Sequence, residues 1–169
     1  VFKKMIELEI PLYVLPLLES KSIKDLEIKE QVALLNKIKY LVPPKIKICL
    51  ETDLKPETVK ILFESLDANI FKINYDIGNS AYEGFSYEDE FNQYFNLIEN
   101  IHIKDRLYKG STVPLGEGDA KILDVLNEIK IRGYKKNLIL QAARINGVND
   151  VKLISKYKKF VEDAVGKKH

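Results

Sequence analysis

The stretch Ile70-Phe71-Lys72-Ile73-Asn74-Tyr75-Asp76-Ile77-Gly78-Asn79 decides the fold, because an apolar, strand-like run over 70–75 ends directly in polar residues. β-Branched and aromatic residues favour a strand. The Asp-x-Gly-Asn sequence that follows is also good turn chemistry, so Asp76 alone could be a turn residue. In parallel α/β folds, functional groups collect at the carboxyl ends of strands. The end of this run is therefore the first place to look for a site.

Outward from this stretch, strand-like runs alternate with helical patterns along the whole chain. Further strands are predicted over 12–18, 46–50, 101–104 and 138–140, and helices over 28–40, 56–65, 87–97, 119–131 and 148–165. Asp119 is the expected N-cap of its helix and Gly133 the expected stop. The last helix is expected to present Val151, Ile154, Tyr157 and Val161 on one face. Residues before 12 resemble the end of another helix.

Strands joined by helical crossovers predict an α/β fold with a parallel βα repeat. Two architectures fit. One is an open, doubly wound sheet of five strands, which the element pattern alone favours. The other is a partial (β/α)8 TIM barrel of about five βα units, since a whole barrel needs roughly 200–250 residues. No segment is a linker long enough to split the chain, so 1–169 is expected to be one domain.

Composition sets the broad class of protein. The chain has 169 residues, 46% hydrophobic and 31% charged, which is ordinary for a globular domain. The net charge of +2, with both signs interleaved, argues against a nucleic-acid or membrane-surface partner. No run reaches the ~18–20 apolar residues of a membrane span. Cys49 is the only cysteine and lies in an apolar run, so we expect it to be buried in a reducing, cytoplasmic setting.

Four successive strand ends carry groups that can bind a cation. Glu51 follows the strand at 46–50, Asp76 follows 70–75, His102 lies in 101–104, and Gln141 follows 138–140. Two carboxylates, an imidazole and an amide suit an octahedral site for Mg²⁺, Mn²⁺ or Co²⁺. Each residue alone has a simpler interpretation, Glu51 as the start of a loop and His102 as a core histidine with satisfied hydrogen bonds. The conjunction of the four favours a site.

The same strand ends resemble motifs of a known superfamily. The residues concerned are Leu50-Glu51-Thr52-Asp53, Asn74-Tyr75-Asp76-Ile77-Gly78-Asn79, Ile101-His102-Ile103-Lys104-Asp105 and Val113-Pro114-Leu115-Gly116-Glu117-Gly118-Asp119. Together they resemble the xylose-isomerase-like TIM barrel superfamily, which includes sugar phosphate isomerases and epimerases and type 2 AP endonucleases. The resemblance runs from about Leu12 to the last helix. It implies a barrel whose first three or so βα units are absent, that is, an N-terminally truncated domain.

The resemblance also implies an activity. Glu51, Asp76 and His102 would bind a divalent metal (Mn, Mg, Co or Zn), with Gln141 at the position of a fourth ligand. Glu51 would also be the catalytic base of an isomerase or epimerase that moves a proton through an enediolate of a sugar or sugar phosphate. Gln141 departs from the superfamily's glutamate. An amide can offer one oxygen to a metal, but it cannot act as a general base.

Further polar residues near the strand ends are candidates for substrate binding. They are Asn74, Asn79, Lys104, Arg106 and Arg144, with the alternative that the cations are only solvated loop charges. The backbone N–H groups of Gly116-Glu117-Gly118-Asp119 could also face an anion.

Two observations favour other functions. Gln141 and the missing strands favour a catalytically inactive relative that binds a sugar or a protein. An AP-endonuclease-like phosphodiesterase is disfavoured, because its several metals need more His and carboxylate ligands. An open half-barrel would also leave two unpaired sheet edges, so a homo-oligomer is expected if the chain is complete.

Overall fold

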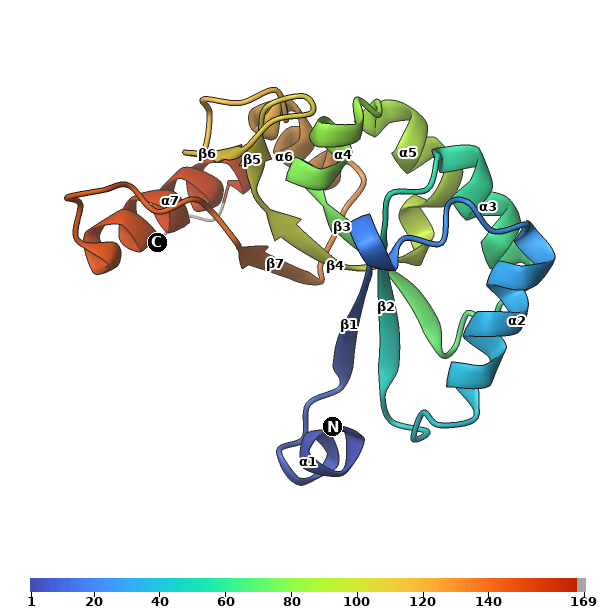
Figure 1. The fold of residues 1–169 in the computed structure, drawn as a ribbon. Coiled ribbons are helices and arrows are strands. Elements are labelled where there is room, and N and C mark those ends of the chain that lie inside the picture. The colour runs from blue at the N-terminus through green and yellow to red at the C-terminus, as the bar shows by residue number, and fades with distance from the viewer. Residues whose placement is uncertain (167–169) are drawn as a thin grey trace. The chain divides into compact units, whose positions relative to one another are not determined.

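The computed structural model describes residues 1–166, so the last three residues of the expected domain lie outside the described part. Five strands are hydrogen-bonded in the order β1-β2-β3-β4-β7 (Figure 1). They are β1 (Leu12–Leu17), β2 (Lys47–Thr52), β3 (Phe71–Asp76), β4 (Ile98–Ile103) and β7 (Asn137–Leu140). The pairings β1–β2, β2–β3 and β4–β7 are parallel. The predicted parallel βα repeat is therefore confirmed.

Seven helices accompany these strands in the described residues, and α4 is the one that the sequence did not predict. They are α1 (Phe2–Glu7), α2 (Ile28–Lys39), α3 (Pro56–Glu64), α4 (Ile77–Glu83), α5 (Tyr87–Tyr94), α6 (Ile122–Ile131) and α7 (Asp150–Val165). Short 3-10 turns cover Glu19–Lys21 and Phe95–Leu97, and a small antiparallel hairpin joins β5 (Asp105–Arg106) to β6 (Thr112–Val113). Within residues 1–166, no helix combines the length and the apolar character needed to cross a membrane.

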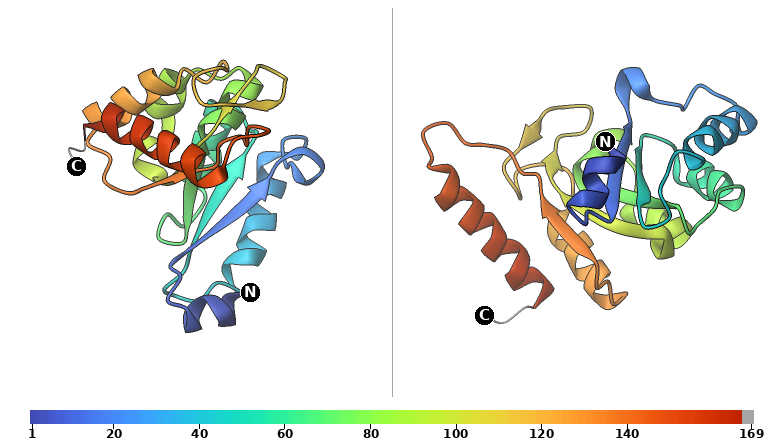
Figure 2. Two further views of the ribbon diagram at one scale, coloured as in Figure 1. Left: turned by 90° about the vertical axis from the view of Figure 1, so that its left-hand side faces the viewer. Right: turned by 90° about the horizontal axis from the view of Figure 1, so that it is seen from below.

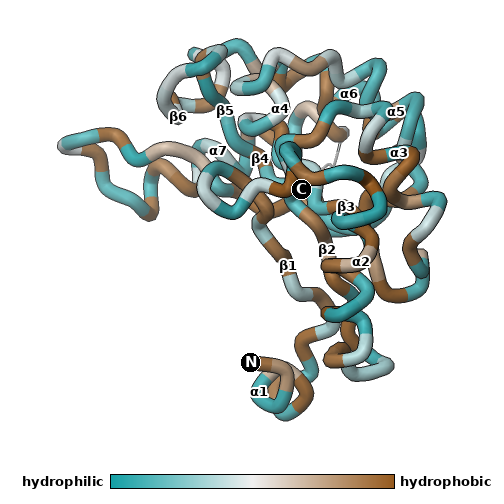
Figure 3. The backbone as a smooth tube through the Cα atoms, turned by 45° about the vertical axis from the view of Figure 1, so that its right-hand side comes forward, coloured by the Kyte–Doolittle hydropathy of each residue, from teal (hydrophilic) through white to brown (hydrophobic). Residues whose placement is uncertain are grey.

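The chain forms two compact units, and the first comprises Val1–Asn74 and Glu88–Glu99. Here α2 and α3 pack together, and the middle of β2, residues 48–50, is hydrophobic (Figure 3). Residues 48–51 of β2 are all buried, as expected of a parallel strand covered on both faces. Local signals set the helix starts. Glu27 and Glu30 form a reciprocal capping box at α2, and Pro56 opens α3.

The second unit comprises Tyr75–Tyr87 and Asn100–His169, described to residue 166. In it α4 packs on β5, and α7 packs on α6 and β7. Figure 2 shows α7 as one long helix before the C-terminus. Its buried face corrects the prediction, because it consists of Leu153, Tyr157 and Val161, whereas Val151 and Ile154 are 72% and 57% exposed. Positions four apart stay aligned on a helix, while Val151 lies about 120° around from Tyr157.

One further local prediction in the second unit was wrong, the start of α6. Helix α6 begins at Ile122 after the N-cap Lys121, which has a positive φ of 46°, and not at Asp119. Asp119 instead accepts a hydrogen bond from the backbone N–H of Tyr108 through Oδ2, at 2.7 Å. Gly133 does follow the end of α6 with φ 70°, as predicted.

Candidate metal centre

Glu51 lies inside β2, one residue before the strand ends, and only 7% of it is exposed. The strand therefore continues through Glu51 instead of ending before it. Its Oε2 accepts a hydrogen bond from Nδ2 of Asn74 on β3 at 2.8 Å, within the first unit. An ionised carboxylate is expensive to bury unless hydrogen bonds or a cation compensate it. The fold thus holds one acidic group in the interior at a strand end, where chemistry is expected.

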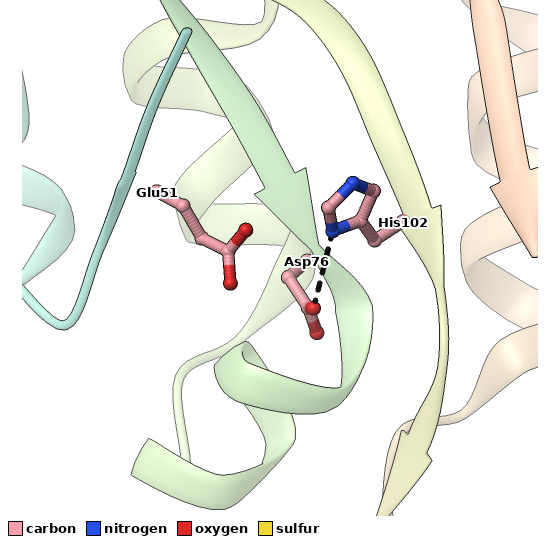
Figure 4. A group of neighbouring side chains, drawn as sticks. All are labelled: Glu51, Asp76 and His102. Carbon is pink, nitrogen blue, oxygen red and sulfur yellow. Dashed lines mark ion pairs between the residues drawn. The ribbon is translucent and has the colours of Figure 1, made fainter. Parts of the chain in front are cut away.

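Asp76 is the last residue of β3 and, at 4% exposure, is also buried. It is the N-cap of α4, because its Oδ1 accepts the backbone N–H of Asn79 at 2.8 Å. Two cationic or potentially cationic groups approach the other oxygen, Oδ2. Lys104 Nζ lies 3.5 Å away and His102 Nδ1 lies 3.6 Å away, the latter shown by the dashed line in Figure 4. Oδ2 is therefore the oxygen of Asp76 that is turned towards cations.

His102 is the next-to-last residue of β4, between Ile101 and Ile103, which are both fully buried. Side chains alternate along a strand, so His102 points to the face opposite these two isoleucines. Its side chain is 12% exposed. At 3.6 Å, the approach of Nδ1 to Asp76 is longer than a normal hydrogen bond. Such a spacing leaves room for both groups to bind a common third atom.

Asn79, Lys104 and Arg106 form a polar chain next to Asp76 in the second unit. Oδ1 of Asn79 accepts from Lys104 Nζ at 3.2 Å and from Arg106 Nη1 at 3.0 Å. Arg106 is held further by Nη2, which donates to the carbonyl oxygen of Gly110 at 3.1 Å, and by stacking 4.0 Å above the ring of Tyr82. Of the predicted substrate-binding cations, Lys104 is thus the one in contact with a candidate metal ligand.

The remaining predicted site residues, Gln141 and Arg144, make other contacts. Gln141 continues the pairing of β7 with β4, since its backbone N–H donates to the carbonyl oxygen of Ile103 at 3.0 Å, but the residue is exposed. By strand alternation from the His102–Ile139 pair, Gln141 shares the face of His102. Arg144 has a side chain 86% exposed and pairs with Asp150, the first residue of α7, at 3.7 Å. Nothing in these contacts connects Arg144 to the strand ends.

Asp105, for which no role was predicted, is almost completely buried, at 1% exposure. Its carboxylate accepts three backbone N–H groups, from Gly116 at 2.8 Å, Gly118 at 3.1 Å and Ala120 at 3.2 Å. The glycine-rich loop does present N–H groups to an anion, as its sequence suggested, but that anion is the side chain of Asp105. The pair of closely spaced glycines was the only signal in the sequence that pointed to this arrangement.

No protein-family model matches the chain, and no curated protein matches it. Solved structures do resemble it. An IolI protein with a bound zinc atom superposes with a TM-score of 0.77 at 22% identity, over 98% of this chain and 68% of that one. A xylose isomerase domain protein from Planctomyces limnophilus gives 0.74 at 20%, over 98% and 63%. A D-tagatose 3-epimerase-like protein gives 0.71 at 21%, over 98% and 67%.

These likenesses define the fold. The chain has the fold of the xylose isomerase-like TIM barrel proteins, as the strand-end motifs indicated, in the form of a partial barrel with five parallel strands. It spans about two thirds of the length of the three structures, between 63% and 68%.

Proposed function

We propose that this chain carries the metal site of a divalent-metal-dependent isomerase or epimerase of a sugar or sugar phosphate. The proposal depends on three side chains, Glu51, Asp76 and His102, which together could hold one metal ion (Figure 4). Two carboxylates and an imidazole are ligands that Mn²⁺, Co²⁺ and Zn²⁺ accept and that Mg²⁺ accepts in part. The donor set therefore fits the implied metal.

Strand β3 gives a reason for Glu51 and Asp76 to serve one site. Asn74, which donates to Glu51, and Asp76 are two residues apart on this strand. Side chains two apart point to the same face of a sheet, about 6.6 Å along the strand. The hydrogen bond from Asn74 thus brings the Glu51 carboxylate to the face on which Asp76 also lies.

In the proposed reaction, Glu51 is the base. Its carboxylate takes a proton from the carbon next to a carbonyl group. In an isomerisation, Glu51 returns this proton to the neighbouring carbon on the same face, while the hydroxyl proton moves to the former carbonyl oxygen. In an epimerisation, water protonates the first carbon on the other face and the proton on Glu51 passes to solvent. The substrate passes through an enediolate. The bound metal would supply electrostatic stabilisation to the substrate oxygens. Asn74 fixes the direction of the Glu51 carboxylate through their hydrogen bond.

Gln141 limits this mechanism to one carboxylate base, because an amide cannot accept the proton. Loss of a second acid–base group costs on the order of 10²–10⁴ in rate where nothing replaces it. This observation supports a second candidate function, a relative that binds a sugar but does not turn it over. The similar structures include a D-tagatose 3-epimerase-like protein and an IolI protein with a bound zinc atom, which supports the sugar and metal parts of the first proposal.

Solvent exchange separates the two candidates. The chain loaded with Mn²⁺ is incubated in D₂O with a panel of ketoses and ketose phosphates, and deuterium at the carbon next to the carbonyl is followed by NMR. Deuterium incorporation that Glu51→Gln abolishes is expected for the isomerase or epimerase. Sugar binding with neither deuterium incorporation nor a new sugar product would support the inactive relative. Calorimetric titration that detects no Mn²⁺ uptake would overturn the metal-dependent proposal.

A further inference from the structure

We infer that Lys104 binds an anionic group of the substrate, a phosphate or a carboxylate, beside Asp76, and that Asn79 and Arg106 position its ammonium group. The inference rests on the proposed function for the location of the substrate. It narrows the substrate class from sugars in general to sugars that carry a negative charge.

The ammonium group of Lys104 makes only long contacts with its two partners. Its Nζ lies 3.2 Å from Oδ1 of Asn79 and 3.5 Å from Oδ2 of Asp76. Hydrogen bonds from an ammonium to an oxygen anion are usually about 2.7–2.9 Å long. An ammonium also has three N–H donors, and these two contacts occupy two of them. With its side chain 17% exposed, Lys104 retains a donor for a further acceptor.

Two cationic groups share one uncharged acceptor at this ammonium. Lys104 and Arg106 both donate to the single amide oxygen of Asn79, which carries no charge. Asp76 is the one carboxylate that pairs with either of them among the described residues. The Nε of Arg106 is buried and has no hydrogen-bond acceptor. Two cations that share a neutral acceptor repel each other, so an incoming anion would be stabilised there.

The two cationic side chains are also held in place. A Cβ atom at Gly78 would lie 2.7 Å from Cγ of Lys104 and 3.1 Å from Cγ of Arg106, so both stems cross the start of α4 in close contact with the glycine backbone. Arg106 is fixed additionally by the ring of Tyr82 and the carbonyl of Gly110. A preorganised donor costs little further conformational entropy when a ligand binds. Lys104 is thus suited to recognise charge at a defined point.

A simpler role for Lys104 would be to neutralise Asp76 only. Its removal would then change the affinity for the metal, because Asp76, which the ammonium neutralises, would be one of the residues that hold the metal. It would not change the preference between a charged and an uncharged ligand of the same shape. This difference decides the experiment.

The test measures ligand affinity by calorimetry, on the whole chain with and without Mn²⁺. D-fructose 6-phosphate is compared with D-fructose, and D-gluconate with D-glucitol, so the two pairs separate phosphate from carboxylate. The variants are Lys104→Met, which keeps the stem over Gly78, and Lys104→Arg, which keeps the charge. Lys159→Met, at an exposed position of α7, is the control for loss of a surface charge.

We expect the wild type to favour the charged member of at least one pair by about tenfold or more. Lys104→Met should weaken that ligand by about 10–100-fold, the value of a hydrogen bond to a charged group, and change the neutral ligand by less than about twofold. Lys104→Arg and Lys159→Met should preserve the preference. Equal affinity for both members of both pairs, or a preference that survives in Lys104→Met, would overturn the inference.

Failure of the two proposals can be told apart. A chain that binds no Mn²⁺ but still favours the anion through Lys104 loses the metal-dependent function and keeps the anion site. A chain that exchanges deuterium into neutral ketoses, with no preference for charged ones, keeps the function and loses the anion site.

Discussion

Oε2 of Glu51 accepts a hydrogen bond from Nδ2 of Asn74 at 2.8 Å, and both side chains are buried. The bond connects β2 to β3 through side chains, close to the carboxyl ends of both strands. It satisfies part of a carboxylate that would otherwise be costly in the interior.

Replacement of Asn74 by Ala is therefore expected to destabilise the fold. The buried carboxylate of Glu51 loses one donor, which costs about 1–3 kcal/mol in free energy of unfolding. Urea unfolding measures this, with the exposed Asn146→Ala as the matched control. In the double variant with Glu51→Gln the two effects should not add, because the residues share one bond. A loss below about 0.5 kcal/mol in Asn74→Ala would contradict this role.

Asp76→Asn is expected to separate capping from metal binding. An asparagine oxygen can still accept the N–H of Asn79, so α4 should keep its cap and the protein its stability. The charge on Oδ2 is lost, so Mn²⁺ affinity should fall by about 10–100-fold, as for other interactions of charged groups. Asp76→Ala should lose the same affinity and a further ~1 kcal/mol of stability. Unchanged Mn²⁺ binding in Asp76→Asn would exclude Asp76 as a ligand.

The strands and most helices could be predicted because their signals are local. The strand-like run predicted β1 at 12–18, and the strand covers Leu12–Leu17. The helical spacing of apolar residues predicted α2 at 28–40, and the helix covers Ile28–Lys39. The candidate ligands could be chosen for the same reason, since polar residues that follow apolar runs mark strand ends. Their joint role as ligands remains a prediction.

What the sequence did not show depends on contacts between distant segments. Helix α4 was missed because Asp76-Ile77-Gly78-Asn79 makes the same side-chain to backbone hydrogen bond in a turn and in a helix cap. The anchoring role of Asp105 depends on a loop that returns to it more than ten residues later along the chain. The buried face of α7 depends on which side meets α6 and β7, and its apolar residues alone cover more than one face.

Asp105→Ala is expected to be strongly destabilising. It leaves three backbone N–H groups, those of Gly116, Gly118 and Ala120, without their acceptor. A loss of about 2–4 kcal/mol follows, from roughly 1–3 kcal/mol per unsatisfied buried group with partial compensation by water. Asp163→Ala on the exposed side of α7 is the control. Thermal and urea unfolding measure both variants. If Asp105→Ala loses no more free energy of unfolding than Asp163→Ala, Asp105 does not anchor this loop.

Gly118→Ala should destabilise the same loop by a different cause. A Cβ atom there would lie 2.7 Å from the carbonyl oxygen of Arg106 and would also clash with the carboxylate of Asp105. Because neither atom belongs to the flexible end of a long side chain, the loop has to move. Gly147→Ala, where a Cβ atom would meet nothing within 4 Å but φ is 77°, measures the cost of backbone strain alone. We expect Gly118→Ala to exceed it in free energy of unfolding.

The raised pKa of Tyr157 is expected to lower the stability of the fold at alkaline pH. The residue is 5% exposed on the buried face of α7, and burial raises the pKa of its phenol above the ordinary value of about 10, with the charge of Glu117 adding to the rise. The folded state therefore holds this proton more strongly than the unfolded state. Its contribution to stability is complete below about pH 10 and is lost as pH rises through the folded pKa.

The Lys residues also titrate in this pH range, so the informative quantity is the difference in free energy of unfolding between the wild type and Tyr157→Phe. That difference should stay constant from pH 7 to about pH 9.5 and then move in favour of Tyr157→Phe, because phenylalanine has no proton to release. A difference in urea-unfolding free energy that stays flat to pH 11 would mean that Tyr157 ionises equally easily in both states.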